Sequence, residues 1–326
     1  MTGLDAPSQY IALSGGIGGA KLVLGLSHLL GENLTVVANT GDDFHHWGLH
    51  ISPDLDTVMY TLAGLSNSQQ GWGLANESWA CLDTMKQLQQ ESWFQLGDRD
   101  LAVHLTRTHM LNQGYSLSAV SDFLRLRFGI AAALLPMSDD PIRTVVHLKD
   151  GSQLPFQHYF VREQCQPAVS AFSFEGSEQA KPSPAFLAAL QHPKLAGVFI
   201  CPSNPFVSID PILSLPGLRQ QLKQLSAPVI AVSPIVAGQA IKGPSAKIMQ
   251  ELALPITAQQ VARHYEDFLD GFILDQQDHA LQKSIEADIG SVRLAQTLMH
   301  SLDDRIQLAK TCLDFAQTLR QPKQKS

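Results

Sequence analysis

Four glycines and a lysine lie close together near the start of the chain, where an apolar run gives way to an apolar stretch of helical period. The glycines are Gly15, Gly16, Gly18 and Gly19, and the lysine is Lys21. This order predicts a strand, a tight turn and a helix start, where exposed backbone N–H groups attract a phosphate. Glycine suits such a turn because it has no Cβ to keep a ligand oxygen from the main chain. We therefore expect these five residues to bind the phosphates of a nucleotide.

The turn matches neither of two common nucleotide-binding motifs. Lys21 is followed by Leu22 rather than Ser or Thr, so it is not a P-loop, and Lys21 also occupies the third glycine position of the dinucleotide fingerprint. A nicotinamide dehydrogenase is disfavoured further because Asn39, not an isolated acid, ends the second expected strand. A glycine-rich connection that binds nothing is the remaining alternative.

Carboxylates follow the second expected strand in two pairs, Asp42 with Asp43 and Asp54 with Asp56. Carboxylates beside a phosphate repel it unless a cation lies between them, and Mg²⁺ binds one or two carboxylates together with phosphate oxygens and water. We expect these four residues to hold Mg²⁺, and Asp54 and Asp56 to act in catalysis. The alternative for the second pair is a structural role, because acids in the first turn of a helix are favoured by its dipole.

Two further polar loops follow expected strands. Ser203 and Asn204 lie between two prolines and could hydrogen-bond a heterocycle, or form a plain turn. Lys242 and Gly243 lie in a loop before a helix and form a second candidate for anion binding.

Other residues give weaker signals. Asp98 fits the N-cap of a helix, and Arg99 could clamp a phosphate or a carboxylate. His45, His46 and His50 lie in one loop with no matching cysteine, which does not favour a zinc site.

The elements that must position these loops alternate between strand and helix. Several expected strands are continuous apolar runs, which is typical of strands buried on both faces of a parallel sheet. The pattern predicts an α/β fold, a doubly wound and mostly parallel Rossmann-like sheet with a β-rich insertion and added helices, and ligands at the carboxyl ends of its strands. The expected strands are 10–13, 34–38, 130–135, 144–148, 197–200, 229–232 and 272–274, and the expected helices are 21–30, 55–65, 79–89, 100–111, 116–128, 184–191, 218–225, 246–252, 258–265 and 303–319.

Length and composition indicate one domain over residues 1–326, with a β-rich insertion at 150–184 and a flexible tail at 321–326. A formal net charge of −7 argues against a nucleic-acid partner. We see no signal peptide and no apolar stretch that could span a membrane, and the four cysteines form no C-x-x-C pair. We expect a cytoplasmic protein with reduced cysteines and no membrane partner.

Several of these segments, taken together and in order, resemble the 2-phospho-L-lactate transferase (CofD) family of coenzyme F420 biosynthesis. The resemblance implies transfer of a phospho-carboxylate group from a guanosine diphosphate conjugate to the terminal hydroxyl of the deazaflavin Fo, giving F420-0 or its dehydro form and GMP, with Mg²⁺ required. The donor acid could be 2-phospho-L-lactate, phosphoenolpyruvate or 3-phosphoglycerate. The matching segments are 14–21, 39–43, 52–58, 96–100, 136–140, 202–205 and 233–244.

The resemblance also implies roles for individual residues. The glycine loop and the 202–205 loop would bind guanosine diphosphate, and Fo would contact Asp54, Thr57, Asp98, Arg99 and Met137. We expect a homodimer. The alternative is a non-catalytic regulator of the gluconeogenesis-factor type, which shares the fold and senses nucleotide sugars, although segments 52–57 and 97–100 look like the transferase pattern.

Overall fold

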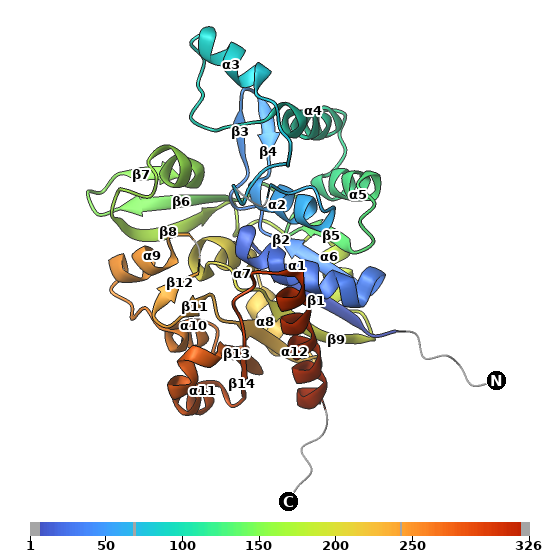
Figure 1. Ribbon diagram of the computed structural model, residues 1–326, viewed down its shortest axis with the longest axis vertical. Helices are drawn as coiled ribbons and strands as arrows, with labels where there is room; N and C mark the ends of the chain where they lie inside the picture. The colour runs from blue at the N-terminus through green and yellow to red at the C-terminus, as the bar shows by residue number, and fades with distance from the viewer. Residues whose placement is uncertain (1–6, 68–69, 242, 321–326) are drawn as a thin grey trace, which may run out of the picture.

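The core of the molecule is a sheet of seven parallel strands in the order β14-β13-β10-β9-β1-β2-β5 (Figure 1). The computed structural model describes residues 7–67, 70–241 and 243–320. The strands β9, β10 and β13 are buried along their whole length, as their apolar sequences predict. Their bounds are β1 Gln9–Ser14, β2 Leu34–Ala38, β5 Ala133–Pro136, β9 Leu195–Ile200, β10 Val229–Val232, β13 Gly271–Asp275 and β14 Val292–Ala295.

Helices cover both faces of this sheet and bury a separate apolar cluster on each. One cluster lies under α1, α2, α4, α5 and α12, and the other lies under α6 to α11. The predicted doubly wound α/β class is therefore confirmed. The helix bounds on the first face are α1 Ile17–Leu30, α2 Pro53–Leu62, α4 Asp98–Asn112, α5 Leu117–Arg127 and α12 Leu302–Arg320; on the second they are α6 Pro184–Leu190, α7 Asp210–Leu213, α8 Leu218–Lys223, α9 Ser245–Glu251, α10 Ala258–His264 and α11 Gln282–Ile289.

The order in which strands are added to the sheet reverses at β1, which pairs with β2 on one side and with β9 on the other. Such a switch point opens a crevice beyond the carboxyl ends of the strands. The loops that follow β1, β2 and β9 therefore meet at one edge of the sheet.

Smaller elements extend from this edge. The hairpin of β3 (Phe44–His46) and β4 (Leu49–Ile51) rises with α3 (Ala80–Gln87) at the top of Figure 1. On one flank lies an antiparallel sheet of β6 (Arg143–Leu148), β7 (Gln153–Pro155) and β8 (Val169–Glu175), with the short helix η2 (His158–Arg162) between the last two strands. Shorter segments are η1 Gly31–Asn33, η3 Pro205–Ile209, η4 Gln276–Leu281, β11 Ile235–Val236 and β12 Gln239–Ala240.

Two local predictions are wrong, and one strand was missed. The strand expected at 144–148 belongs to the small antiparallel sheet rather than to the main sheet, because β6 pairs only with β7 and β8. Helix α1 begins at Ile17, not at 21, so Gly18 and Gly19 lie in its first turn. Strand β14 was not expected, because its sequence alternates between apolar and polar residues and is only half-buried.

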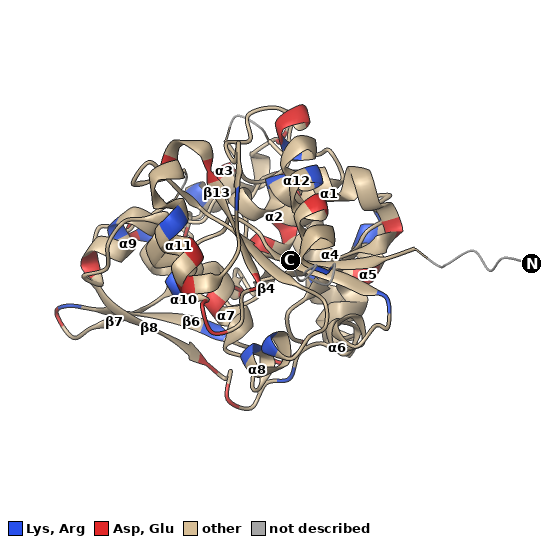
Figure 2. Cartoon of the chain, turned by 90° about the horizontal axis from the view of Figure 1, so that it is seen from below, with Lys and Arg blue, Asp and Glu red and all other residues tan. Residues whose placement is uncertain are grey.

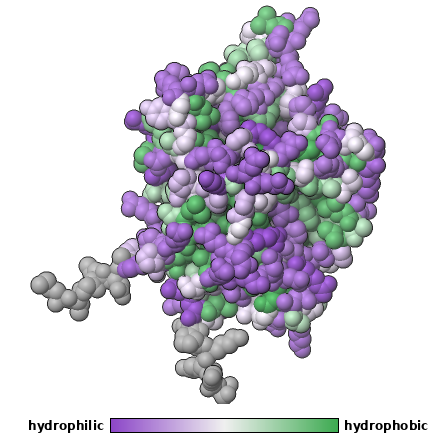
Figure 3. All heavy atoms as spheres, turned by 180° about the vertical axis from the view of Figure 1, so that it is seen from behind, coloured by the Kyte–Doolittle hydropathy of each residue, from purple (hydrophilic) through white to green (hydrophobic). Residues whose placement is uncertain are grey.

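Charges of both signs are scattered over the helices in the view from below (Figure 2). On the rear face, apolar and polar side chains are intermixed (Figure 3). No helix among the described residues is both long and apolar enough to cross a bilayer. The tail expected at 321–326 lies outside the described residues.

Candidate functional site

A cavity of about 630 Å³ opens at the switch-point edge of the sheet. Its walls come from the loops after β1, β2, β9 and β10, from the start of α2, and from the small antiparallel sheet with η2. The lining residues singled out by the sequence are Gly16, Gly18, Lys21, Asp42, Asp54, Thr57, Ser203, Asn204 and Gly243. The structure thus brings together residues that are more than 200 positions apart in the chain.

The N-terminus of α1 forms one wall of the cavity. Gly16 is its N-cap, and the N–H groups of the first turn have no partner within the helix. Close packing explains two of the glycines: a Cβ at Gly16 would lie 2.5 Å from an oxygen of Asp54, and one at Gly18 would lie 2.4 Å from the carbonyl oxygen of Pro202. The wall is therefore bare backbone at the positive end of a helix dipole, which suits a phosphate.

Two carboxyl groups, Asp42 and Asp54, line the cavity, and Asp54 lies against Gly16 at this helix end. Asn39 joins them to the sheet, since its Nδ2 donates to Asp54 Oδ2 at 3.0 Å and its Oδ1 accepts from the Gly41 N–H at 2.8 Å. Burial raises the pKa of Asp54 to about 7, and Asp43 adds to this, although hydrogen bonds from Asn39 and the Gly16 N–H oppose it. The carboxyl of Asp54 is therefore poised to exchange a proton near neutral pH.

Asp42 is almost completely buried, and its Oδ1 has no hydrogen-bond partner among the described groups. Burial, with repulsion from Asp54 and Asp43, raises the pKa of Asp42 well above its usual range. A divalent cation beside Asp42 and Asp54 would remove this repulsion and satisfy the orphaned oxygen. No three His, Cys, Asp or Glu side chains converge as a closed metal site in the described part of the chain, but Mg²⁺ takes only one or two carboxylates.

Asp43 and Asp56 are each predicted to bind the metal, but neither lines the cavity. The Oδ2 of Asp43 accepts from Ser52 Oγ at 2.8 Å and lies 3.0 Å from His50 Nε2. Asp56 forms a buried ion pair with Arg107. Ser52 stands at the N-cap of α2, yet its hydroxyl binds Asp43 rather than the helix.

The loop after β9 packs against the start of α1. Ser203 Oγ accepts from the Gly15 N–H at 3.1 Å, so Gly15 is used in holding the two loops together. Asn204 Oδ1 caps η3 through two backbone N–H groups, while its buried Nδ2 has no partner among the described residues. Because Asn204 lines the cavity, this amide group is available to donate to a ligand.

Lys21 lines the cavity from within α1, one turn after the helix begins at Ile17. Its Nζ donates to the carbonyl oxygen of Met299 at 3.1 Å. Among the described lining residues, Lys21 is the only lysine or arginine, whereas Asp42 and Asp54 are both acidic. Lys242, the other predicted cation, lies outside the described residues.

Aromatic residues from three separate segments form the remaining wall, and sequence reasoning missed them. Trp93 lies 4.9 Å from His158 of η2 between ring centres, so these two segments touch, and Phe156 stacks on Phe160 at 5.4 Å. Aromatic residues in polar loops are the signal that could have revealed them. This aromatic wall consists of Trp72, Trp93, Phe94, Phe156 and Phe160.

Other predicted site residues lie outside the cavity. Asp98 caps α3, accepting from the N–H groups of Ala80 and Cys81, and Arg99 donates to the carbonyl oxygen of Ala75. Met137 is fully buried in the core.

Comparison with known proteins identifies a family and a shared fold. Residues 11–307 match the family described as 2-phospho-L-lactate transferase CofD. The chain is 40% identical over 319 residues to a phosphoenolpyruvate transferase of Kitasatospora aureofaciens (96% of this chain, 99% of the relative). It is 38% identical over 301 residues to a 2-phospho-L-lactate transferase of Methanosarcina mazei (92% of this chain, 98% of the relative). A crystal structure of a UPF0052-family protein from Bacillus halodurans shares the fold, with a TM-score of 0.59, 14% identity, and coverage of 94% of this chain and 99% of that one.

Proposed function

The chain belongs to the 2-phospho-L-lactate transferase (CofD) family, and from this premise we propose that it moves a phospho-carboxylate group from a guanosine diphosphate conjugate to the terminal hydroxyl of Fo. The observation that carries the proposal is the division of the cavity into a polar wall, an aromatic wall and a carboxyl pair. A nucleoside diphosphate suits the first, a flat deazaflavin ring suits the second, and the reacting atoms would meet at the third.

On the polar wall, the first-turn N–H groups of α1 would receive the diphosphate. Asn204 would donate its free amide N–H to the nucleotide, and Ser203 would hold the facing loops together. The two loops that bring these groups together are the ones that the sequence pattern singled out for nucleotide binding.

On the aromatic wall, ring faces would stack on the deazaflavin, which is flat and partly apolar. Aromatic pairs contribute about 0.5–1.5 kcal/mol beyond the area that they bury. Trp72 and Phe160 are both partly exposed, so they can approach a ligand without displacing core atoms.

In the reaction, the ribityl hydroxyl of Fo would attack the phosphorus that carries the acid, and the bond from this phosphorus to GMP would break. Asp54 would accept the hydroxyl proton, because its carboxyl lines the cavity and lies against Gly16 at the phosphate-binding helix end. Mg²⁺, held by Asp42 and Asp54, would neutralise charge on the phosphoryl oxygens. The residues present fit this ion, since an acidic cavity with one lysine among the described lining residues offers too little positive charge for a diphosphate.

The proposal is tested by incubating the protein with Fo, Mg²⁺ and each of three synthetic guanosine diphosphate conjugates, and following the deazaflavin by mass spectrometry. We expect one conjugate, carrying phospholactate, phosphoenolpyruvate or phosphoglycerate, to give the corresponding F420-0 species and GMP. Binding of GDP without turnover of any conjugate would instead favour the nucleotide-sensing regulator. A homodimer and a cytoplasmic location also remain predictions, the first to be tested by light scattering.

The variant Asp54→Asn distinguishes a general base from a residue that only binds Fo. As a general base, Asp54 contributes about 10²–10⁴-fold to the rate, so turnover should fall by that factor while affinity for Fo is kept. If affinity for Fo collapses and single-turnover chemistry at saturating Fo is normal, Asp54 only binds the acceptor. Thr57→Ala, on the same helix and also lining the cavity, is the matched control for loss of a contact without loss of a carboxylate.

A further inference from the structure

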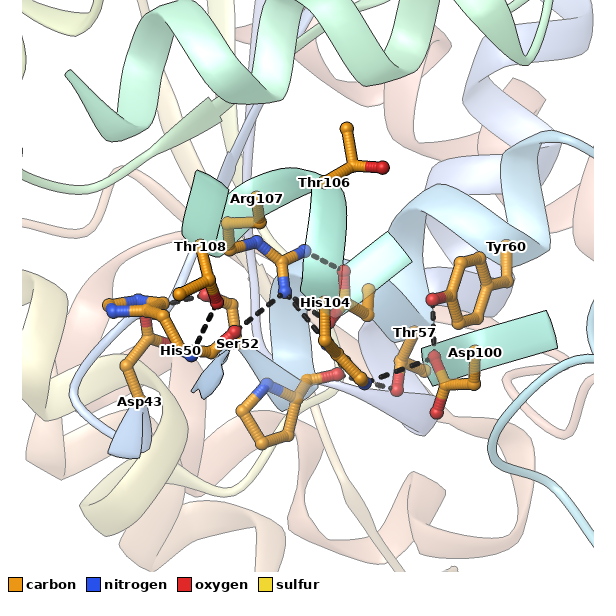
Figure 4. A network of polar contacts seen from close by, with 12 residues as sticks. Asp43, His50, Ser52, Thr57, Tyr60, Asp100, His104, Thr106, Arg107 and Thr108 are labelled. Atoms are coloured by element: carbon orange, nitrogen blue, oxygen red, sulfur yellow. Dashed lines mark hydrogen bonds and ion pairs between the residues drawn. The ribbon is translucent and has the colours of Figure 1, made fainter. Parts of the chain in front are cut away.

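A buried polar network joins α4 to α2 and to the β3–β4 hairpin (Figure 4). Its members Asp56, Asp100 and Arg107 do not line the cavity. It is built on one face of α4, where Asp100, His104 and Arg107 recur at helical spacing and are all buried. Arg107 is completely shielded from solvent. Arginine is almost never buried in this way unless it is paired, so each of its partners matters.

Arg107 contacts the first turn of α2 and the end of β4. Its guanidinium group forms two hydrogen bonds with the carboxylate of Asp56, and Nη1 also donates to the carbonyl oxygen of His50 at 3.4 Å. Burial favours the neutral guanidine, but Asp56, Tyr60 and Asp43 together raise the pKa of Arg107. A fixed positive charge therefore stands behind the acidic side of the cavity.

Helix α4 also contacts α2 one turn further along. Tyr60, one turn beyond Asp56, donates its hydroxyl to Asp100, and His104 lies between the two contacts, 3.1 Å from Arg107 and 3.2 Å from Asp100. Asp56 is two residues from Asp54. The contacts of Asp100, His104 and Arg107 with α2 form what we call the α4 clamp. This clamp fixes the turn of α2 that presents Asp54 to the cavity.

The clamp also reaches Asp42 through the β3–β4 hairpin. Thr108, next to Arg107, accepts from the His50 N–H at 2.8 Å, and the His50 ring lies 3.0 Å from Asp43. Asp43 is the neighbour of Asp42. Each carboxyl group in the cavity is thus one or two residues from a group tied to the Arg107 end of α4.

From this geometry we propose that Arg107 is a positioning residue: it sets the relative placement of Asp42 and Asp54, and so the affinity of this pair for a divalent cation. The inference rests on the proposed function for the identity of the cation. A simple stabilising role explains the geometry less well, because apolar side chains can replace a buried ion pair without loss of stability. Two forked hydrogen bonds do what apolar packing does not, since they fix direction as well as distance.

The test compares Arg107→Met and Arg107→Lys with the parent protein. The first readout is the affinity for Mn²⁺ in the presence of GDP, measured by electron paramagnetic resonance, which needs no turnover. Groups that orient metal ligands typically alter metal affinity by about 10–100-fold when removed, so we expect a loss of this size in Arg107→Met. Arg107→Lys keeps the charge but not the fork, and we expect an intermediate affinity.

Thermal unfolding and circular dichroism establish that each variant is folded at the assay temperature. If Arg107→Met does not fold, the double variant D56L/R107M replaces the pair with apolar groups and removes no group that lines the cavity. The matched control is R263M/D288L, which removes an ion pair between α10 and α11, helices with no residue in the cavity. It should leave Mn²⁺ affinity unchanged.

Kinetics with Fo, where turnover is found, provide the second readout. We expect kcat and Mn²⁺ affinity to fall together while KM for Fo stays within about threefold, because the aromatic wall is untouched. A folded Arg107→Met or D56L/R107M protein with parental Mn²⁺ affinity would overturn the inference. Failure of the parent to use any donor would reject the proposed function alone, because the Mn²⁺ comparison does not depend on turnover.

Discussion

At the scale of single residues, the surroundings of Asp54 give a signature in protein stability. The carboxyl has a pKa of about 7 in the folded chain, chiefly because of burial, and about 3.9 in an unfolded one. Between these values the folded state binds more protons, so the free energy of unfolding falls as pH rises from about 4 to 7. Asp54→Asn should therefore be more stable than the parent at pH 8 without divalent cations, and the difference should fade towards pH 4.

The control for this stability prediction has the opposite sign. Hydrogen bonds from Arg263 and Gln259 lower the pKa of Asp288, so this carboxylate stabilises the fold at neutral pH and ceases to do so when protonated. Asp288→Asn should be less stable than the parent at pH 8. Equal melting temperatures for Asp54→Asn and the parent across this pH range would show that the pKa of Asp54 is not raised in the folded protein.

Gly18 provides a prediction about backbone approach. A Cβ would lie 2.4 Å from the carbonyl oxygen of Pro202, so Gly18→Ala must push apart the two loops that face the nucleotide. We expect affinity for GDP, measured by calorimetry, to fall at least about tenfold, or ~1.4 kcal/mol. Gly290→Ala strains a left-handed position after α11 that does not line the cavity, and should lower stability but not affinity. Parental affinity in Gly18→Ala would remove this loop from the nucleotide site.

At the scale of elements, α9 fastens the small antiparallel sheet to the main body. Glu251 accepts from the Val169 N–H of β8 at 3.1 Å and from Lys247 Nζ at 2.5 Å, and Lys247 also donates to the carbonyl oxygen of Pro167. The small sheet with η2 supplies Phe156 and Phe160 to the cavity, while Ser245 at the start of α9 lines it from the other side. These contacts therefore connect two parts of the cavity rim.

Glu251→Gln should loosen this connection, because a hydrogen bond to a charged group contributes about 1.5–3 kcal/mol. Hydrogen exchange followed by mass spectrometry should become faster in β8 and stay unchanged in β9 and β10. Lys86→Met breaks an exposed ion pair on α3 and serves as control, with no effect expected in β8. Unaltered exchange in β8 of Glu251→Gln would show that other contacts hold the small sheet.

At the scale of the whole molecule, the cavity joins loops from nearly the full length of the chain, so its ligand should stabilise the fold as a unit. A ligand at 100 times its Kd adds about 2.7 kcal/mol to the free energy of unfolding. For a chain of this size we expect GDP to raise Tm by several degrees with Mg²⁺ and by much less with excess EDTA, because the described lining residues provide two carboxylates and one lysine. An equal rise in both conditions would argue against a cation in the nucleotide site.

The fold class and the positions of the cavity loops follow from patterns in the sequence. Continuous apolar strands require helices on both faces, and parallel strands place their carboxyl ends together, so the glycine loop and Asn204 had to meet. Asp42 was predictable for the same reason, because it comes shortly after the second strand, whereas Asp54 follows only after the β3–β4 hairpin, at the start of α2. Local pattern was sufficient wherever a residue's position depends only on the strand that it follows.

Which polar residues face the cavity, and which of them hold it in place, depends on long-range packing. Asp54 and Asp56 have the same side chain two positions apart on one helix, and 3.6 residues per turn sends the second towards Arg107. Asp98, expected at a ligand, caps a neighbouring helix, and the aromatic wall gathers residues that share no pattern in the sequence. Side-chain direction and long-range packing depend on what the rest of the chain brings alongside, and spacing along one segment does not contain that information.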